Sequence, residues 1–212
     1  MSRFTDASPD PKSPIKTLMR IGYTMPSAVS DILDNSITAN AKNIEIRSLP
    51  GLEEPNISIV DDGDGMSPDE LIHNMRIGCK DPSDERLRGD LGRFGSGLKT
   101  ASFSQARRLT VISKKVGGPL CAAIWDIDRI ENENTWCLEI LEEDELKSHP
   151  LLLLDSQLGQ GTQVIWEKLS CINKTSHSLD NETIMSANLS DLSDYISLHF
   201  HKFMEGQNKR RF

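Results

Sequence analysis

The chain has 212 residues and a net charge of −8, and hydrophobic residues make up 37% of it. This length suits one domain, or one domain with the start of another, and the composition is typical of a soluble globular protein. The negative charge argues against a protein that coats nucleic acid, because that role needs a broadly basic surface, although a local basic patch remains compatible with it. The apolar run at 151–154 is too short to cross a membrane.

The four cysteines have no C-x-x-C spacing, which argues against a zinc site or a disulfide framework and indicates a reducing compartment. The N-terminal residues lack the apolar core of a signal peptide. We therefore expect a protein that is not secreted and has no membrane anchor, and that is cytoplasmic, or nuclear in a eukaryote.

The first predicted elements are an arm and a two-sided helix. Residues 1–14 are rich in Ser, Pro and Asp and are expected to form a flexible arm. A helix should begin near Pro26, since proline is favoured in a first turn. At about 100° per residue, its side chains separate into an apolar arc and a polar arc. The apolar arc consists of Ala28, Val29, Ile32, Leu33, Ser36 and Ile37, and the polar arc of Asp31, Asp34, Asn35 and Thr38.

Strands and a second helix should follow. Residues 43–49 alternate between apolar and polar, and 57–60 is a short strand that ends at an Asp/Gly turn. Ser67 with Glu70 three positions later predicts a helix start. Residues 76–97 hold five glycines without periodicity, which indicates a long functional loop. Beyond it, the expected elements are a helix from 98 to 103, strands at 108–114, 120–127, 135–141 and 162–167, an irregular connector at 142–160, and a helical stretch at 179–204.

Asp31 and Asn35 are the first pair with evident chemistry. Four residues apart on a helix, their side chains are neighbours. A carboxylate in this place can orient or deprotonate a water, and an amide oxygen can ligate Mg²⁺, which prefers oxygen ligands. The alternative is an ordinary solvated helix face.

Asp61 follows a strand and leads into Gly63 and Gly65. Glycine allows positive φ and close backbone approach, and a carboxylate at a strand end can accept a hydrogen bond from the adenine amino group. The alternative is a plain Asp/Gly turn. An EF-hand is excluded because the Asp spacing and the position-12 Glu do not fit.

Residues 92–100 form a glycine-rich segment that runs into a helix. Leu98 stands between Gly97 and Lys99, which breaks the G-x-x-x-x-G-K-[ST] pattern and excludes a Walker P-loop. Backbone N–H groups and the helix N-terminus can still bind phosphate oxygens, and Lys99 can add a point charge. The alternative is a surface loop of mixed charge.

Taken together, these segments resemble the ATP site of the Bergerat-fold (GHKL) ATPase superfamily, which includes gyrase B, the large heat-shock chaperones, MutL, MORC proteins and histidine kinases. Residues 28–39 resemble its N box, 60–67 its G1 box, 92–99 its G2 box and 161–166 its later Gly-Thr strand. The resemblance covers roughly 15–170 and is greatest to the MORC-like and MutL-like branch.

This resemblance implies an α/β two-layer sandwich, with a mixed, mostly antiparallel sheet, helices on one face and a mobile ATP lid. The ATP-binding domain would span 15–175. The helical segment 176–212 would be the start of a following domain that the chain does not complete.

The resemblance also assigns roles within the site. Asp31 takes the place of the general base, Asn35 that of the Mg²⁺ ligand, and Asp61 that of the adenine-reading carboxylate. The other residues implied to contact the nucleotide are Ala39, Gly63, Gly65, Met66, Lys80, Gly92, Phe94, Gly95, Ser96, Gly97, Leu98, Lys99 and Thr162. Of these, Thr162 would contact Asp61 or its water, and Lys80 would belong to the lid.

The main departure from the family is Asp31, because hydrolytic members usually carry Glu there. The shorter side chain moves the carboxylate by at most about 1.5 Å, the length of one C–C bond, and catalysis is sensitive to misplacement of roughly 1 Å. We therefore expect ATP binding with Mg²⁺ and slow ATP hydrolysis. A non-hydrolysing ATP sensor or scaffold is the alternative. A histidine-kinase-like phosphotransferase is less favoured, because such kinases generally lack a carboxylate at the position of Asp31.

The resemblance further implies that lid closure over ATP drives a conformational or dimerisation switch. In MutL-like and MORC-like relatives, a second domain supplies a lysine to the terminal phosphate. Residues 176–212 are too few for a complete domain, so we expect this lysine from a following domain, a partner or a homodimer. Nucleic acid is a possible partner, but this acidic chain does not show one.

Overall fold

The computed structural model describes residues 10–48, 52–78, 97–154, 159–172 and 178–204. The helices are α1 (Lys12–Met19), α2 (Met25–Thr38), α3 (Pro68–Met75), α4 (Gly97–Gln105), α5 (Ile127–Glu133), α6 (Glu143–Lys147), α7 (Ser178–His199) and α8 (His201–Met204). The strands are β1 (Ile44–Ser48), β2 (Ile57–Asp61), β3 (Ala106–Lys114), β4 (Leu120–Asp126), β5 (Glu139–Ile140) and β6 (Gly161–Leu169). No helix in these ranges is long and apolar enough to cross a membrane.

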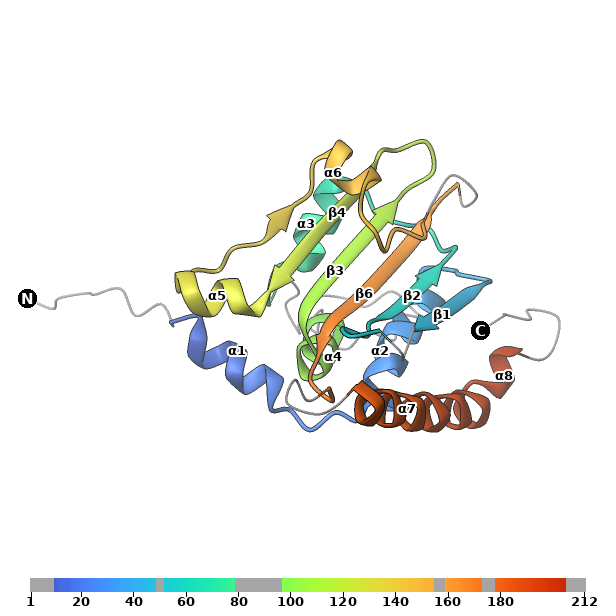
Figure 1. Ribbon diagram of the computed structural model, residues 1–212. Helices are drawn as coiled ribbons and strands as arrows, with labels where there is room; N and C mark the ends of the chain where they lie inside the picture. The colour runs from blue at the N-terminus through green and yellow to red at the C-terminus, as the bar shows by residue number, and fades with distance from the viewer. Residues whose placement is uncertain (1–9, 49–51, 79–96, 155–158, 173–177, 205–212) are drawn as a thin grey trace, which may run out of the picture.

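The strands form one sheet in the order β1-β2-β6-β3-β4-β5. The expected two-layer α/β architecture is confirmed, although every observed pairing is antiparallel rather than mixed. Strand β6 lies between β2 and β3, far from either in sequence (Figure 1). This insertion places Thr162 opposite both Asp61 of β2 and Ser113 of β3.

One face of the sheet carries the larger hydrophobic core. Helices α2, α3 and α4 contribute buried side chains to this core, and α7 packs against α2 (Figure 1). Alternate residues of the strands face it, among them Ile59 of β2 and Trp166 of β6. The indole Nε1 of Trp166 donates to Ser102 Oγ at 2.8 Å, which ties the sheet to α4.

The opposite face is covered by α6 and residues 151–154, within the expected irregular connector. Leu146 of α6 and Leu154 pack there against a second, smaller cluster. Gln163 of β6 is fully buried, and its Oε1 accepts the backbone N–H groups of Leu153 and Leu154. The expectation of helices on one face alone is therefore wrong for α6, because the sheet has two apolar faces and both must be buried.

Two other helices were not anticipated. Helix α1 begins at Lys12, inside the range expected to be an arm, and it buries Ile15 against the core. Helix α5 replaces part of an expected strand and loop. Its N-cap is Asp126, whose carboxylate accepts from the backbone N–H of Asp128, and Ile130 is buried. The strand expected at 135–141 is reduced to β5, because only its last residues pair with β4.

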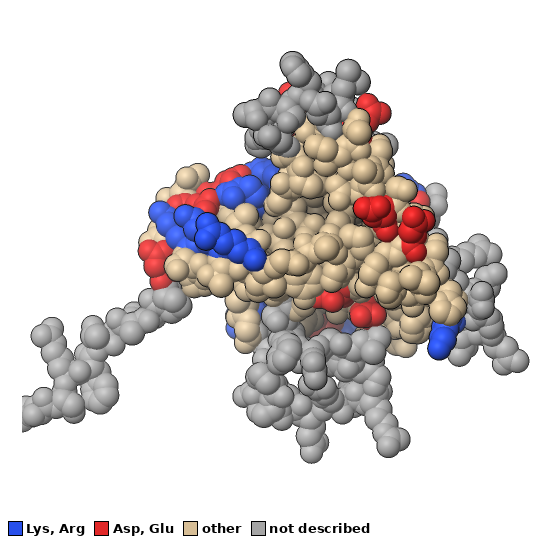
Figure 2. Space-filling view, turned by 90° about the horizontal axis from the view of Figure 1, so that it is seen from below, with Lys and Arg blue, Asp and Glu red and all other residues tan. Residues whose placement is uncertain are grey.

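Helix α1 also carries a local basic stripe. Lys12, Lys16 and Arg20 recur every fourth position and line an open groove with Asp10, Ser13 and Thr17. Figure 2, seen from below, shows Lys and Arg gathered on the left, where α1 lies in Figure 1. Lys16 lies 3.9 Å from Glu131, an exposed ion pair that adds little stability.

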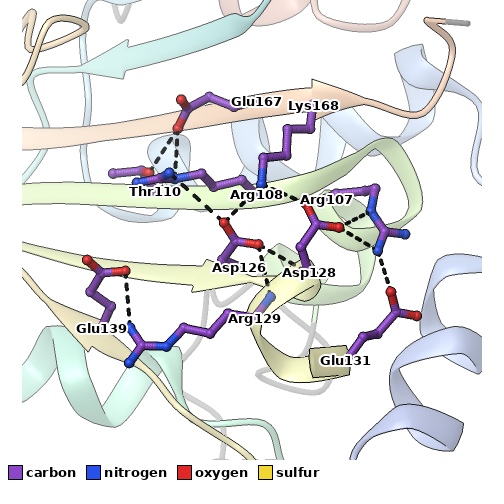
Figure 3. A network of polar contacts seen from close by, with 10 residues as sticks. All are labelled: Arg107, Arg108, Thr110, Asp126, Asp128, Arg129, Glu131, Glu139, Glu167 and Lys168. Atoms are coloured by element: carbon purple, nitrogen blue, oxygen red, sulfur yellow. Dashed lines mark hydrogen bonds and ion pairs between the residues drawn. The ribbon is translucent and has the colours of Figure 1, made fainter. Parts of the chain in front are cut away.

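A second group of charges joins the ends of β3, β4 and β6 to α5 (Figure 3). Lys168 Nζ contacts Asp126 Oδ2 at 3.1 Å and Asp128 Oδ2 at 2.6 Å. Arg107 contacts Asp128 and Glu131. Burial acts to raise the pKa of the Asp128 carboxyl, but the bonds from Lys168 and Arg107 outweigh it and hold this pKa below its usual range. These cations already have carboxylate partners, so the cluster joins secondary-structure elements and does not form an anion site.

Candidate functional site

Helix α2 presents the Asp31 and Asn35 side chains on its polar side. Thr24 caps the helix by accepting from the backbone N–H of Ser27, and Pro26 lies in the first turn as expected. The predicted apolar arc is buried, whereas Asp31 is half-buried and Asn35 is exposed. The two-sided helix predicted from the sequence is confirmed.

Asp31 lies against the start of α4. A β-carbon built on Gly97 would be 3.6 Å from Asp31 Oδ2. The same oxygen accepts a hydrogen bond from the Tyr23 hydroxyl at 3.0 Å. The fold therefore brings the candidate base next to the last glycine of the glycine-rich segment, although the two are far apart in sequence.

Asp61 is buried at the end of β2, with 6% of its surface exposed. Its Oδ1 accepts the backbone N–H of Gly63 at 2.9 Å, and its Oδ2 accepts the hydroxyl of Ser36 at 2.8 Å. Burial raises the pKa of the Asp61 carboxyl, and bonds from Gly63, Ser36 and the backbone of Thr162 oppose this rise. The carboxylate is thus fixed between α2, the G1-like turn and β6.

The glycines of this turn allow close backbone approach. A β-carbon on Gly63 would lie 2.7 Å from the carbonyl oxygen of Ala39. Gly65 has φ +67°, and its β-carbon would lie 1.9 Å from the carbonyl oxygen of Lys114. Ala39 also accepts the backbone N–H of Asp64 at 2.8 Å. The expected site residues Ala39 and Gly63 therefore pack together where α2 ends, and Gly65 lies against the end of β3.

Met66 and Thr162 meet at a serine that the sequence did not single out. Ser113 Oγ accepts the backbone N–H of Met66 at 2.9 Å, and it lies 2.9 Å from Thr162 Oγ1. It also donates to the carbonyl oxygen of Gly161 at 3.0 Å. This hydroxyl joins β3, β6 and the G1-like turn.

Three polar residues of the site were therefore missed. Ser36 gave a usable signal, because it is the one hydroxyl in the apolar arc of α2, where a polar group needs a buried partner. For Ser113 and Tyr23, the local sequence pattern contains no signal that they belong to the site. Their partners are 47 and 8 residues away in sequence.

Gly161 provides a test of this packing. It has φ +140°, and a β-carbon there would lie 2.0 Å from the carbonyl oxygen of Asp61. We expect Gly161→Ala to lower the free energy of unfolding by about 3 kcal/mol, because overpacking and backbone strain add. Urea denaturation measures this. In Gly22→Ala the new β-carbon meets no atom within 4 Å, so equal denaturation midpoints for the two variants would contradict the argument.

Lys99 is almost fully buried near the start of α4. It is 1% exposed, and its Nζ donates to the carbonyl oxygen of Asn74 at 2.6 Å. Asn74 belongs to α3 and Lys99 to α4, so the contact joins the two helices that flank residues 79–96. The expected contact of Lys99 with a phosphate stays a prediction. Leu98 is partly buried and packs against the core.

The remaining predicted contacts lie outside the described residues. These are Lys80, Gly92, Phe94, Gly95 and Ser96.

A metal ion at this site would depend on Asn35. Its exposed amide lies one helical turn from Asp31. In the described ranges, no group of three His, Cys, Asp or Glu side chains could hold a metal. The single amide oxygen of Asn35 fits a Mg²⁺ ion whose other ligands would be nucleotide phosphates and water.

Comparisons with known proteins identify the family of this chain. A family model described as "Histidine kinase-, DNA gyrase B-, and HSP90-like ATPase" matches residues 23–162. This match spans more than half of the chain and begins and ends at residues of the site. The chain belongs to this family of ATPases, the GHKL superfamily with the Bergerat fold.

The relatives of this chain match it over only a small part of their own length. ATPase morc-1 of Caenorhabditis elegans is 32% identical over 91 residues, which cover 43% of this chain and 10% of that protein. Chaperone protein HtpG of Paramagnetospirillum magneticum is 36% identical over 97 residues, covering 41% of this chain and 15% of HtpG. HtpG of Burkholderia cenocepacia is 30% identical over 144 residues, covering 57% and 23%. The chain thus corresponds to less than a quarter of the length of each of these relatives.

Proposed function

We propose that this chain binds ATP with Mg²⁺ along α2 and hydrolyses it slowly. The observation that best supports this proposal is that α2 contacts both the proposed adenine end and the proposed phosphate end of the site. Near its C-terminal end, Ser36 holds the buried Asp61 carboxylate at 2.8 Å. Near its middle, Asp31 lies against Gly97 at the start of α4. An adenine at Asp61 and phosphates at Gly97 would place the terminal phosphate beside Asp31 and Asn35.

Each group has a defined role in this proposal. Asp61 accepts a hydrogen bond from the adenine amino group, while Gly63, Gly65 and Met66 shape the base pocket. The backbone at the start of α4 offers N–H groups to the phosphates. Asn35 ligates Mg²⁺, and Asp31 accepts the proton of the attacking water. Because Asp31 is shorter than the usual Glu, the favoured activity is slow, and a non-hydrolysing ATP sensor is the second candidate.

ATP binding should also act on the segment between α3 and α4. We expect a non-hydrolysable ATP analogue with Mg²⁺ to slow amide hydrogen exchange in residues 76–99 and at Asp61, because the nucleotide would contact both. Hydrogen-exchange mass spectrometry with and without Mg²⁺ measures this. Guanosine nucleotide is the control, since guanine presents a carbonyl where adenine has its amino group. Absence of adenine-specific protection would contradict the proposal.

We further propose that ATP binding promotes self-association or docking of another domain. The proposal is supported by the match to only 10%, 15% and 23% of the three relatives, because those proteins contain further segments on which an ATP-bound domain could act. Light scattering with and without the ATP analogue tests self-association, and an unchanged mass would leave docking of a further domain as the proposed outcome.

A further inference from the structure

Tyr23 lies in the short link between α1 and α2, at the edge of the proposed catalytic site. Its hydroxyl donates to Asp31 Oδ2 at 3.0 Å. Its own carbonyl oxygen accepts the side-chain Nε2 of Gln105 at 3.1 Å, and Gln105 is 9% exposed at the end of α4. The backbone of Tyr23 is therefore anchored to α4, while its hydroxyl donates a hydrogen bond to the carboxylate of α2.

The two ends of α4 thus act on one side chain of α2. Gly97 at the start of α4 lies against Asp31 Oδ2, and Gln105 at its end anchors Tyr23. Within the described ranges, Asp31 Oδ1 accepts no hydrogen bond. One oxygen of the carboxylate is therefore fixed, and the other remains to accept from a water.

We propose that Tyr23 is a positioning residue for ATP hydrolysis that orients the short carboxylate of Asp31. The proposal rests on the function proposed above. A carboxylate on one methylene group can rotate away from the water, and a fixed donor on Oδ2 restricts that rotation. The restriction matters because a misplacement of about 1 Å can lower a catalytic rate by roughly 100-fold.

The reaction balances without a proton from Tyr23. The water oxygen forms a bond to the terminal phosphorus, the bond from this phosphorus to the ADP oxygen breaks, and the proton of the water passes to Asp31 Oδ1. The phenol remains protonated throughout. Burial raises the pKa of Tyr23, and the hydrogen bond to Asp31 and its negative charge raise it further.

The simpler explanation is that Tyr23 only fills space, since its ring packs against the main core. Tyr23→Phe keeps the ring and removes the hydroxyl, so it separates the two explanations. The chain has two tyrosines, and Tyr195 of α7 stacks on His199 at 3.8 Å between ring centroids. Tyr195→Phe is therefore the matched control.

The experiment is a double-mutant cycle on the full chain, with kcat, KM and affinity for the ATP analogue measured for each protein. We expect Tyr23→Phe to lower kcat about tenfold, as for loss of a hydrogen bond to a charged group, with affinity for the analogue within about twofold of the wild type. Tyr195→Phe should change neither quantity. In an Asp31→Asn background, Tyr23→Phe should have no further effect, because the base it positions is absent.

Two results would overturn the positioning role alone: a wild-type kcat in Tyr23→Phe, or an equal loss in the Asp31→Asn background. If the wild-type protein binds ATP but does not hydrolyse it, the proposed hydrolysis and this role both fail. A spectroscopic measurement covers the case of a poorly folded variant. With Tyr195→Phe as background, Tyr23 is the remaining tyrosine, and Asp31→Asn should lower its pKa by removing the carboxylate. An unchanged titration of the phenol would overturn the contact itself.

Discussion

Asp61→Asn is expected to weaken ATP binding by at least about 100-fold while the fold persists. The amide can still accept the backbone N–H of Gly63, now bonded to Oδ1 at 2.9 Å. Its NH₂ group, however, replaces the oxygen that would accept from the adenine amino group, so two donors would face each other and a buried group would lack its partner. Isothermal titration with the ATP analogue measures the affinity.

The stability of Asp61→Asn should be equal to that of the wild type or higher. Burial raises the pKa of the Asp61 carboxyl, which means that keeping it charged opposes folding at neutral pH. The contribution of such a group to stability is greatest at low pH and is lost as pH rises through its folded-state pKa. The pH dependence of ATP binding should have the opposite sign to that of stability. Wild-type affinity should fall as pH falls through this raised pKa, and the variant should lack that dependence.

Asp62→Asn is the matched control on the neighbouring position. The Asp62 carboxylate accepts the backbone N–H groups of Lys42 and Asn43 at 2.7 and 2.8 Å. Burial acts to raise its pKa, but the bonds from Asn43 and Lys42 outweigh this and lower it. We expect Asp62→Asn to cost about 1–3 kcal/mol of stability with little change in affinity. A loss of ATP binding in both variants, or in neither, would contradict the role assigned to Asp61.

Asp31→Asn is expected to lower the rate of ATP hydrolysis by a factor on the order of 10² to 10⁴, the usual contribution of a general base. ATP affinity should remain, because Asp61, Asn35 and the start of α4 are unchanged. Asp31→Glu should raise turnover if the short side chain limits the rate. Phosphate release under saturating ATP measures both variants.

Asp34→Asn is the control for the charge of this helix face. Asp34 is one turn from Asp31, and burial, followed by the charge of Asp31, raises the pKa of its carboxyl. If charge alone mattered, Asp34→Asn would reduce turnover as Asp31→Asn does. We expect a change below about threefold, since Asp34 has no assigned contact with water or nucleotide. Unchanged turnover in Asp31→Asn would remove Asp31 as the base.

Sequence patterns were sufficient to predict an element where the contacts that stabilise it lie within a few residues of one another. Ser67 and Glu70 form the predicted capping box, with Glu70 accepting the backbone N–H of Ser67 at 2.8 Å. The two arcs of α2 and the short strand that ends at Asp61 were likewise readable, because helix and strand periods appear within a few residues. The spacing of Asp31 and Asn35 follows from helix geometry alone.

The short helices α1, α5 and α6 could not be predicted in this way. Isolated helices of five to eight residues are unstable in water, and they form here because each buries an apolar side chain against another element. The deepest of these, Ile15, Ile130 and Leu146, are 0%, 0% and 1% exposed.

The sequence by itself determined the motifs and their order, because these depend on residue types and spacing along the chain, and their resemblance to a known superfamily implied the class of fold and the ATPase family. Only the tertiary structure decided which groups meet. The insertion of β6 between β2 and β3 brings Thr162 to Asp61, and the approach of α4 to α2 brings Gly97 to Asp31. Hydrogen bonds such as those of Ser36 with Asp61 and Tyr23 with Asp31 carry no local periodicity. They form only after burial of the two apolar sheet faces has set the positions of the helices.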